Sequence, residues 1–317
     1  MIITIAGHKG DELQSALITW SISDKSGTVS DRASLTLNSD QLSFLPASGQ
    51  EYSLSVEGEG RGKWQVSTIT EEFEPDRIVL QLSPAKFNTK DPTGWREPRK
   101  RSFPPATVGD VVHAVMSPHG YTVRVDPELA SVKTEHLNQS EETDSAFITR
   151  LARRYDANAK PINNLFVFGR KGSLNKLSGN AKPVVEITRK DLKRGATKMQ
   201  HATHIKFKGA KASYRVTETG ENAEVTIGEA PFTFVKELFT SEAEARSNAS
   251  ARLQELTRNG QTFSTTIHGK RGLWAESVLT VSGLSARTKG NWSIDDVTLS
   301  GSRTKYDIQI TASRPRG

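Results

Sequence analysis

The stretch with the densest potential for chemistry is HLNQSEETDSAFITRLARRY, residues 136 to 155. It places three carboxylates, Glu141, Glu142 and Asp144, within four positions. Three arginines follow, at Arg150, Arg153 and Arg154. A carboxylate pair can perform general acid–base catalysis where burial or a neighbouring like charge raises the pKa of one member. The element that carries these acids therefore decides whether they form an active site.

The apolar residues after the acids recur at the spacing of one helix face. They are Phe147, Ile148, Leu151, Ala152 and Tyr155. Thr143 or Ser140 is a suitable N-cap, and the acids then lie near the positive end of the helix dipole. Because such a cap is solvated, it supplies neither burial nor crowding of charge. We predict a structural helix built on Thr143, Asp144, Phe147, Leu151 and Tyr155.

Other side chains with catalytic or metal-binding potential are sparse. The chain has no cysteine, which excludes disulfides, thiolate metal sites and a cysteine nucleophile. Among the seven histidines, His201 and His204 are three positions apart, and on a strand this spacing points them to opposite faces. We predict no catalytic, cofactor-binding or metal-binding residues and no cofactor. Two carboxylates distant in sequence could still form a glycosidase site, which leaves that alternative open.

A basic cluster lies in the Pro-rich connection between residues 88 and 107. It consists of Trp95, Arg96, Arg99, Lys100 and Arg101. The whole chain carries a net charge of +7 and has a pI near 9.5, which favours an anionic partner. The cluster is a candidate interface or lumen surface, where arginines contact phosphates and the indole offers a stacking face. The alternative is a cluster that is solvated or pairs with acids on a neighbouring surface.

Strand periodicity dominates both ends of the chain. Alternating apolar residues separated by turn residues predict a small tube-like β domain at 1–87. Residues 88–172 predict a linker and a small α+β domain, and the β patterning of 173–317 predicts a second tube-like β domain. Within this last part, a capping box of Ser241 and Glu244 begins a helix at 241–259, which Asn259 and Gly260 end. We expect a mainly β (α+β) fold, soluble and unprocessed, without the ~18 apolar residues of a membrane span.

The run from residue 101 to 172 resembles a known family. Its order is an RS segment, a short helix, the turn HLNQ, an acidic helix start, the helix RLARRY and the strand LFVF. This order is similar to that of the late control D, or baseplate hub, proteins of contractile-tailed bacteriophages and R-type pyocins. VSDRASLTLN before the run and WSIDDVTLSGS near the end of the chain extend the likeness to most of the sequence.

This resemblance implies a structural role in the tail baseplate of a virion that assembles in the bacterial cytoplasm. Family members carry two tail-tube-type β-barrels and form homotrimers, in which six barrels make a ring. The ring joins the sixfold tail tube protein to the threefold central spike protein, among other baseplate proteins. In a phage, DNA passes through the ring as cargo, whereas a pyocin carries none. No enzymatic activity is implied.

Two other functions remain as alternatives to a hub. The segment TVGDVVHAV is similar to the start of a peptidoglycan-binding LysM repeat, although it occurs once and inside a longer unit. A tail component that binds peptidoglycan is therefore one alternative. A cell-wall-degrading muramidase is the other, and the interpretation of the acids as a solvated helix start disfavours it.

Overall fold

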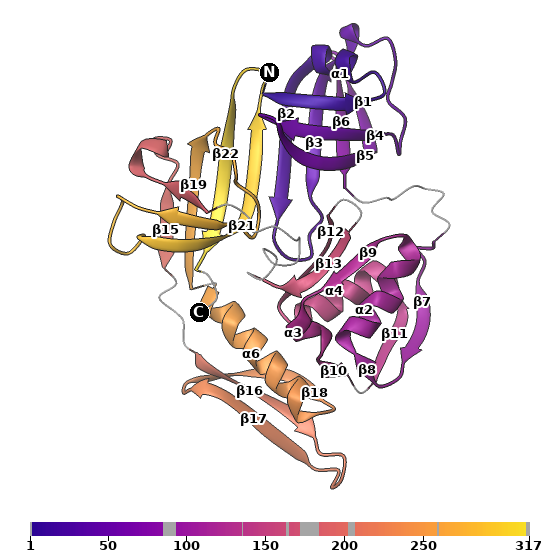
Figure 1. The fold of residues 1–317 in the computed structure, drawn as a ribbon, viewed down its shortest axis with the longest axis vertical. Coiled ribbons are helices and arrows are strands. Elements are labelled where there is room, and N and C mark those ends of the chain that lie inside the picture. The colour runs from indigo at the N-terminus through magenta and orange to yellow at the C-terminus, as the bar shows by residue number, and fades with distance from the viewer. Residues whose placement is uncertain are drawn as a thin grey trace.

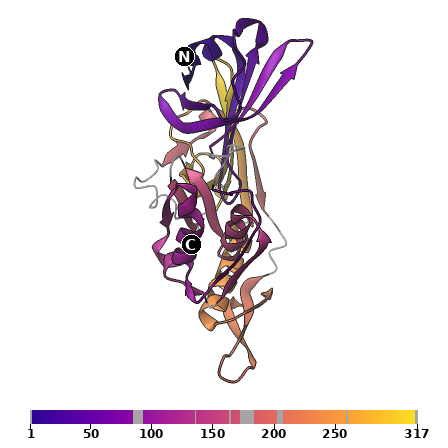
Figure 2. The ribbon, with the colours of Figure 1, turned by 90° about the vertical axis from the view of Figure 1, so that its right-hand side faces the viewer.

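The computed structural model of the protein describes residues 2–84, 93–134, 136–162, 165–171, 184–201, 207–258 and 260–314. Figure 1 shows a large sheet with indigo and yellow parts, a compact α+β unit in magenta, and a small sheet with one helix in orange. Turned by 90°, the molecule is narrow, as Figure 2 shows. The fold is mainly β, which confirms the predicted class.

The N-terminal part of the large sheet has one short helix and six strands. The elements are β1 (Ile3–Gly7), α1 (Gly10–Ala16), β2 (Leu17–Lys25), β3 (Arg32–Asn38), the 3-10 turn η1 (Ser39–Gln41), β4 (Glu51–Val56), β5 (Glu59–Glu72) and β6 (Arg77–Ser83). In space the strands run β1-β4-β5-β6-β3-β2, each antiparallel to its neighbour. Alternate residues such as Ala33, Leu35 and Leu37 are buried, because successive side chains of a strand point to opposite faces.

The C-terminal part of the large sheet repeats this arrangement. Its elements are β14 (Val185–Ile187), the 3-10 turn η3 (Arg189–Asp191), β15 (Lys198–His201), β19 (Gln261–His268), β20 (Val278–Val281), β21 (Gly290–Gly301) and β22 (Tyr306–Ser313). In space the strands run β14-β20-β21-β22-β19-β15. Numbered from one in chain order, both parts have the strand order 1-4-5-6-3-2. The pairing sense is also the same, except that β14 and β20 are parallel.

The duplication extends to single residues of the two longest strands. In β5, Trp64 is buried and its indole donates to the carbonyl of Arg61 at 3.0 Å. In β21, Trp292 is buried and its indole donates to the carbonyl of Thr288 at 2.9 Å. A β-bulge then interrupts each ladder at the third residue after the tryptophan. The two parts are therefore equivalent position by position along these strands.

The connections that lead into β4 and β20, the strands before β5 and β21, are equivalent as well. The N–H of Gly49 donates to the carbonyl of Val66, and the N–H of Glu276 donates to the carbonyl of Ile294, both at 2.8 Å. Gly49 and Glu276 both have left-handed backbone angles, with φ of 82° and 65°. Glycine reaches that region without steric cost, whereas glutamate does not. The C-terminal part thus keeps the backbone path of its counterpart despite a less suitable residue.

Strands β2 and β21 join the two parts into one twelve-stranded sheet. Their antiparallel register runs from Trp20 opposite Gly301 to Lys25 opposite Asp296. Apolar residues of both parts form a single hydrophobic core. The β2–β21 ladder pairs an edge strand of each part, so that neither edge leaves unpaired backbone groups. The predicted division of the two β regions into two tail-tube-type barrels stays a prediction.

The α+β unit follows the N-terminal part of the sheet and has its own core. Its elements are β7 (Arg99–Phe103), β8 (Ala106–Thr107), α2 (Val108–Met116), the 3-10 turn η2 (Ser117–His119), β9 (Thr122–Val125), α3 (Pro127–Ala130), β10 (Lys133–Thr134), β11 (Leu137–Glu142), α4 (Asp144–Arg154), β12 (Ala157–Ile162) and β13 (Leu165–Arg170). β9, β12 and β13 form one sheet, and β7 pairs with β11. Thr107 and Asp110 form a capping box at α2.

A smaller unit is inserted between β15 and β19. It consists of β16 (Lys208–Arg215), β17 (Asn222–Glu229), β18 (Phe232–Phe239) and α6 (Glu242–Arg258), which packs on the three strands. The Ser241 hydroxyl accepts a bond from the Glu244 N–H at 3.3 Å, while the predicted helix end at Asn259 lies outside the described residues. The predicted domain boundaries, 87/88 and 172/173, also lie outside them, so the division into three domains stays a prediction.

Candidate interaction sites

The three carboxylates of the 136–155 stretch do not share one environment. Glu141 and Glu142 belong to strand β11, before the helix begins. Thr143 caps α4, and its hydroxyl accepts a hydrogen bond from the N–H of Ala146 at 3.1 Å. Asp144, the first residue of α4, is fully buried. The expectation that all three acids form a solvated helix start is therefore wrong, because β11 takes up the first two and packing encloses the third.

The apolar face of α4 holds Asp144 in place. Phe147, Leu151 and Tyr155 are buried in the core of the α+β unit. The Phe147 ring stacks on the ring of Phe103 from β7, with centroids 5.3 Å apart. Burial of each such side chain contributes roughly 1.5–3 kcal/mol to the stability of the folded state. A helix anchored in this way fixes the position of its first residue.

The basic residues of β7 face the acids of β11 and α4. Arg101 donates to the Asp144 carboxylate, and Arg99 Nε lies 3.5 Å from Asp144 Oδ2. Lys100 Nζ lies 2.8 Å from Glu141 Oε1 on the exposed side of the same strand pair. All three basic residues therefore have acidic partners within the chain. Arg99 and Arg101 share the single Asp144 carboxylate, so their two charges are only partly neutralised within the chain.

The other two members of the cluster, Trp95 and Arg96, differ in exposure. Trp95 is buried, and its ring meets the ring of His119 edge-on with centroids 4.7 Å apart. The expectation of an indole free for base stacking is therefore wrong, because the core of the α+β unit covers it. Arg96 is exposed and borders a cleft of about 500 Å³ that Asp31 also lines. A lumen role for this cluster stays a prediction, and Arg96 and Lys100 are its exposed cations.

Asp144, His119 and Thr93 form a carboxylate–imidazole–hydroxyl chain. His119 Nε2 lies 2.8 Å from Asp144 Oδ2, and His119 Nδ1 lies 2.6 Å from the Thr93 hydroxyl. The order of groups is that of a catalytic triad, in which a carboxylate orients a histidine that activates a hydroxyl. His119 is buried, however, and Trp95 packs against its ring. Sequence reasoning missed this chain of groups because its members are 25 or more residues apart.

The electrostatics of Asp144 favour a structural role for this chain of groups. Burial alone would raise the pKa of the Asp144 carboxyl. Hydrogen bonds from His119 and Gln139, together with the charges of Arg101 and Arg99, outweigh burial and hold the pKa below its ordinary value. A carboxylate already compensated by two guanidiniums has little charge left to stabilise an imidazolium. The network instead ties β7, β11 and α4 together.

A buried lysine joins the α+β unit to the large sheet. Lys160 from β12 places its Nζ 2.8 Å from Asp24 Oδ1, 3.0 Å from Asp31 Oδ1 and 2.7 Å from the Lys25 carbonyl. Its side chain is only 4% exposed. Asp24 and Lys25 belong to β2, and Asp31 precedes β3. The same lysine therefore fixes the end of the β2–β3 hairpin to the α+β unit.

The charges of this joint do not balance, since one ammonium faces two carboxylates. Burial raises the pKa of Asp31 to about 6 in spite of Lys160, and the nearby Asp24 adds to the rise. The Lys160 pKa is also raised, because the two carboxylates outweigh the effect of burial. Both directions are consistent: the lysine stays charged, and the carboxylate pair takes up one proton near pH 6. Sequence reasoning missed this joint, because Lys160 lies 129 or more positions from Asp24 and Asp31.

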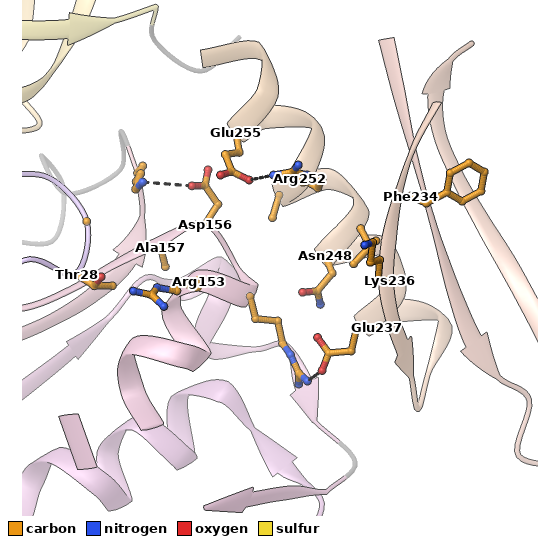
Figure 3. A pocket seen from close by; sticks show the side chains of 15 residues that line it. Thr28, Arg153, Asp156, Ala157, Phe234, Lys236, Glu237, Asn248, Arg252 and Glu255 are labelled. Carbon is orange, nitrogen blue, oxygen red and sulfur yellow. Dashed lines mark hydrogen bonds and ion pairs between the residues drawn. The ribbon is translucent and has the colours of Figure 1, made fainter. Parts of the chain in front are cut away.

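A second joint lies between the α+β unit and the small inserted unit, around a cleft of about 610 Å³ (Figure 3). At the end of α4, Arg154 donates to Glu237 of β18 and to Glu244 of α6, the latter at 2.7 Å. Asp156 pairs with Arg258 of α6. The Arg154–Glu244 and Arg258–Asp156 pairs are largely shielded from water, so loss of either partner would leave a buried charge without compensation.

The lining of this cleft is suited to holding units together rather than to catalysis. Each of its carboxylates, Asp156, Glu237 and Glu255, forms an ion pair with a basic residue. Within the described ranges, no cluster of three or more histidine, aspartate or glutamate side chains could hold a metal ion. No described helix is long and apolar enough to cross a membrane. The fold is thus a duplicated sheet to which two smaller units are attached, with ion pairs at the joints.

Comparison with known proteins identifies the family. The family model of the phage tail baseplate hub (GPD) matches residues 30–305, so the chain belongs to this family of structural proteins in the virion baseplate. The probable baseplate hub protein of Escherichia phage P2 is 26% identical over 365 residues, which cover 98% of this chain and 91% of that protein. These findings confirm the resemblance that the 101–172 run indicated.

Solved structures show the same fold at low sequence identity. The 43 kDa tail protein of prophage MuSo2 from Shewanella oneidensis has a TM-score of 0.70 and 16% identity, with 99% of both chains covered. The E. coli c3393 protein, a component of the type VI secretion system with structural similarity to the T4 tail proteins gp27 and gp5, has a TM-score of 0.61 and 13% identity. That match covers all of this chain and 77% of the other.

Proposed function

We propose that this hub protein acts as a homotrimer that adapts the sixfold tail tube of a contractile tail to its threefold central spike. The duplicated strand order of the large sheet carries this proposal. Three chains supply six equivalent sheet parts, which match the symmetry of a tube. The α+β unit and the small inserted unit occur once in each chain, and three copies of them match a threefold partner.

The partners of the trimer follow from the same arrangement. The tube protein would contact the six sheet parts, while the spike and other baseplate proteins would contact units present three times. In a phage, DNA passes through the ring as cargo, and the net charge of +7 suits its passage. The carboxylates at the joints are engaged in ion pairs, which supports a role without enzymatic activity.

Mass measurement tests this proposal. The purified chain is analysed by light scattering alone and after mixing with the spike and tube proteins of the same tail. We expect a species of three chains of 34.8 kDa each, either alone or once the spike is present. A chain that stays monomeric with both partners present refutes the adaptor role. Clearing of cell walls or retention on insoluble peptidoglycan would instead support a cell-wall function.

A further inference from the structure

Within the described residues, two strand edges of the duplicated sheet, on β15 and β5, have no partner strand. Inside the chain, the second strand of the N-terminal part, β2, is covered by the fifth strand of the C-terminal part, β21. The second strand of the C-terminal part is β15, which among the described residues pairs only with β19. The fifth strand of the N-terminal part is β5, whose residues 68–72 pair only with β6 within the same ranges. The internal junction joins a second strand to a fifth strand. The other second strand, β15, and the other fifth strand, β5, therefore each have an open edge within the described residues.

The position of the bulge shows which residues of the two fifth strands are equivalent. The bulge falls at Ser67 in β5 and at Asp295 in β21. Counting onward from each, Thr70 corresponds to Thr298, and Glu72 corresponds to Ser300. The edge residues of β21 from 296 to 301 are those that pair with β2. Their counterparts in β5 therefore form an open edge. Its geometry is the one that, in β21, pairs with the second strand of the other sheet part.

The ladders also relate the two second strands residue by residue. Ser21 lies opposite Ser34 of β3, which lies opposite Gln81 of β6. Lys198 lies opposite Ser264 of β19, which lies opposite Thr311 of β22. Gln81 and Thr311 each pair with the residue that follows the bulge. Lys198 therefore corresponds to Ser21, and Gln200 corresponds to Ser23.

We propose that β15 of one chain pairs with the 68–72 edge of β5 in a second copy of the chain, in the register of the internal β2–β21 ladder. Inside the chain, Ser21 lies opposite Ser300, and Ser23 lies opposite Thr298. Between chains, the same register places Lys198 opposite Glu72 and Gln200 opposite Thr70. This pairing rests on the proposed trimer and specifies its interface.

The chemistry of the two open edges is complementary. Lys198 and His201 are exposed on β15, whereas Glu71 and Glu72 are exposed at the end of β5. Opposite charges placed directly across a ladder stabilise it, and the internal junction has such a pair in Lys25 and Asp296, at 3.1 Å. The lysine belongs to the second strand and the acid to the fifth strand in both cases. The sign of the charges thus matches the internal junction.

The apolar side chains along these edges are also incompletely covered. Met199 and Ile69 contact the core of the large sheet but are only partly buried. Their internal counterparts, Ile22 and Val297, are fully buried because the β2–β21 ladder covers them. Phe73, directly after the open β5 edge, is 77% exposed. A second copy of the chain would cover these side chains and the unpaired backbone groups of both edges.

A contact of this kind is head to tail, so it repeats around a ring until the ring closes. The contact inside each chain and the contact between chains would then be equivalent. Three internal and three intermolecular junctions would alternate around a closed trimer. The interface of the trimer is in this sense already present inside each chain.

Engineered disulfides test the register, because the chain contains no cysteine of its own. Thr70→Cys and Gln200→Cys are combined in the full chain, which is assembled with the spike protein and oxidised. Residues directly opposite each other have Cβ atoms about 4.5–5.5 Å apart, within reach of a disulfide. We expect covalent trimers on a non-reducing gel. The control combines Thr70→Cys with Lys198→Cys, two positions out of register and about 7–8 Å apart, and should cross-link poorly.

Charge reversal gives a second readout in the same assembled protein. Lys198→Glu or Glu72→Lys alone should weaken trimer formation by about fivefold for each junction, and the double variant should restore it. A trimer that forms normally, but cross-links no better in the matched pair than in the control, overturns this register and leaves the adaptor role intact. A chain that remains monomeric with spike and tube proteins overturns both proposals.

Discussion

Replacing Lys160 with methionine tests whether the buried joint holds the α+β unit to the large sheet. Methionine fills a similar volume but removes the charge that Asp24 and Asp31 face. Removing one partner of a buried ion pair typically costs about 3–5 kcal/mol, because the remaining charge stays buried without compensation. Here two carboxylates remain, and the lysine side chain is only 4% exposed, so screening by water reduces the cost little. We expect a loss near the upper end of this range.

Thermal unfolding measures the effect of this substitution. A loss of about 3–5 kcal/mol lowers the melting temperature by about 6–20 °C at ~2–4 °C per kcal/mol. Lys25→Met is the matched control, because Lys25 pairs with Asp296 where both side chains are partly exposed. Such a pair contributes about 0–1 kcal/mol. The reasoning is wrong if the two variants lose the same stability.

The pH dependence of the same variant identifies the cause of the loss. Since the pKa of Asp31 is about 6 in the folded parent, acidification to pH 5 protonates this carboxyl. In Lys160→Met the proton removes part of the uncompensated charge. The difference in stability between parent and variant should therefore be smaller at pH 5 than at pH 8. An equal difference at both values would show that lost packing, rather than charge, causes the destabilisation.

Three further predictions concern other parts of the molecule. Leu151→Ala should cost roughly 2–5 kcal/mol in denaturant unfolding, whereas Arg153→Ala on the exposed side of α4 should stay within ~0.5 kcal/mol. Burial raises the pKa of Asp295 from 3.8 to about 6, so the stability that its proton contributes is lost as the pH rises through 6. Asp295→Asn should flatten the stability profile between those pH values. Filter binding should find weak, nonspecific DNA affinity that falls steeply with salt, and tight sequence-specific binding would contradict the hub role.

Local sequence patterns predicted the helices and strands better than they predicted which strands pair with each other. The period of the α4 stripe and the capping residues of α2 and α6 depend on neighbours within a few positions, so they are visible in the sequence. The large sheet depends on β2 meeting β21, and in this ladder Trp20 lies opposite Gly301. Strand periodicity shows which face of a strand is buried but not which strand lies beside it. The pairing of β2 with β21 was therefore not foreseen.

The duplication did leave a trace in the sequence. Trp64 and Trp292 are each followed at the second and fifth positions by a β-branched apolar residue, and at the sixth by threonine. This spacing reflects the bulge, which shifts the buried face by one residue, and a search for strict alternation overlooks it. The buried charges were harder to foresee. Aspartate and lysine are residue types of the protein surface. Asp144 and Lys160 tolerate burial only because distant residues pair with them.

The β2–β21 ladder also has a consequence for the order in which the chain folds. The N-terminal strands leave the ribosome first, but β21 lies close to the end of the sequence. At about 5–20 residues per second, the β2 edge waits for tens of seconds before its partner is synthesised. During that time an open strand edge can pair with another nascent chain. Asp24 and Lys25 lie on this edge, and such charged residues discourage premature pairing until the last strands arrive.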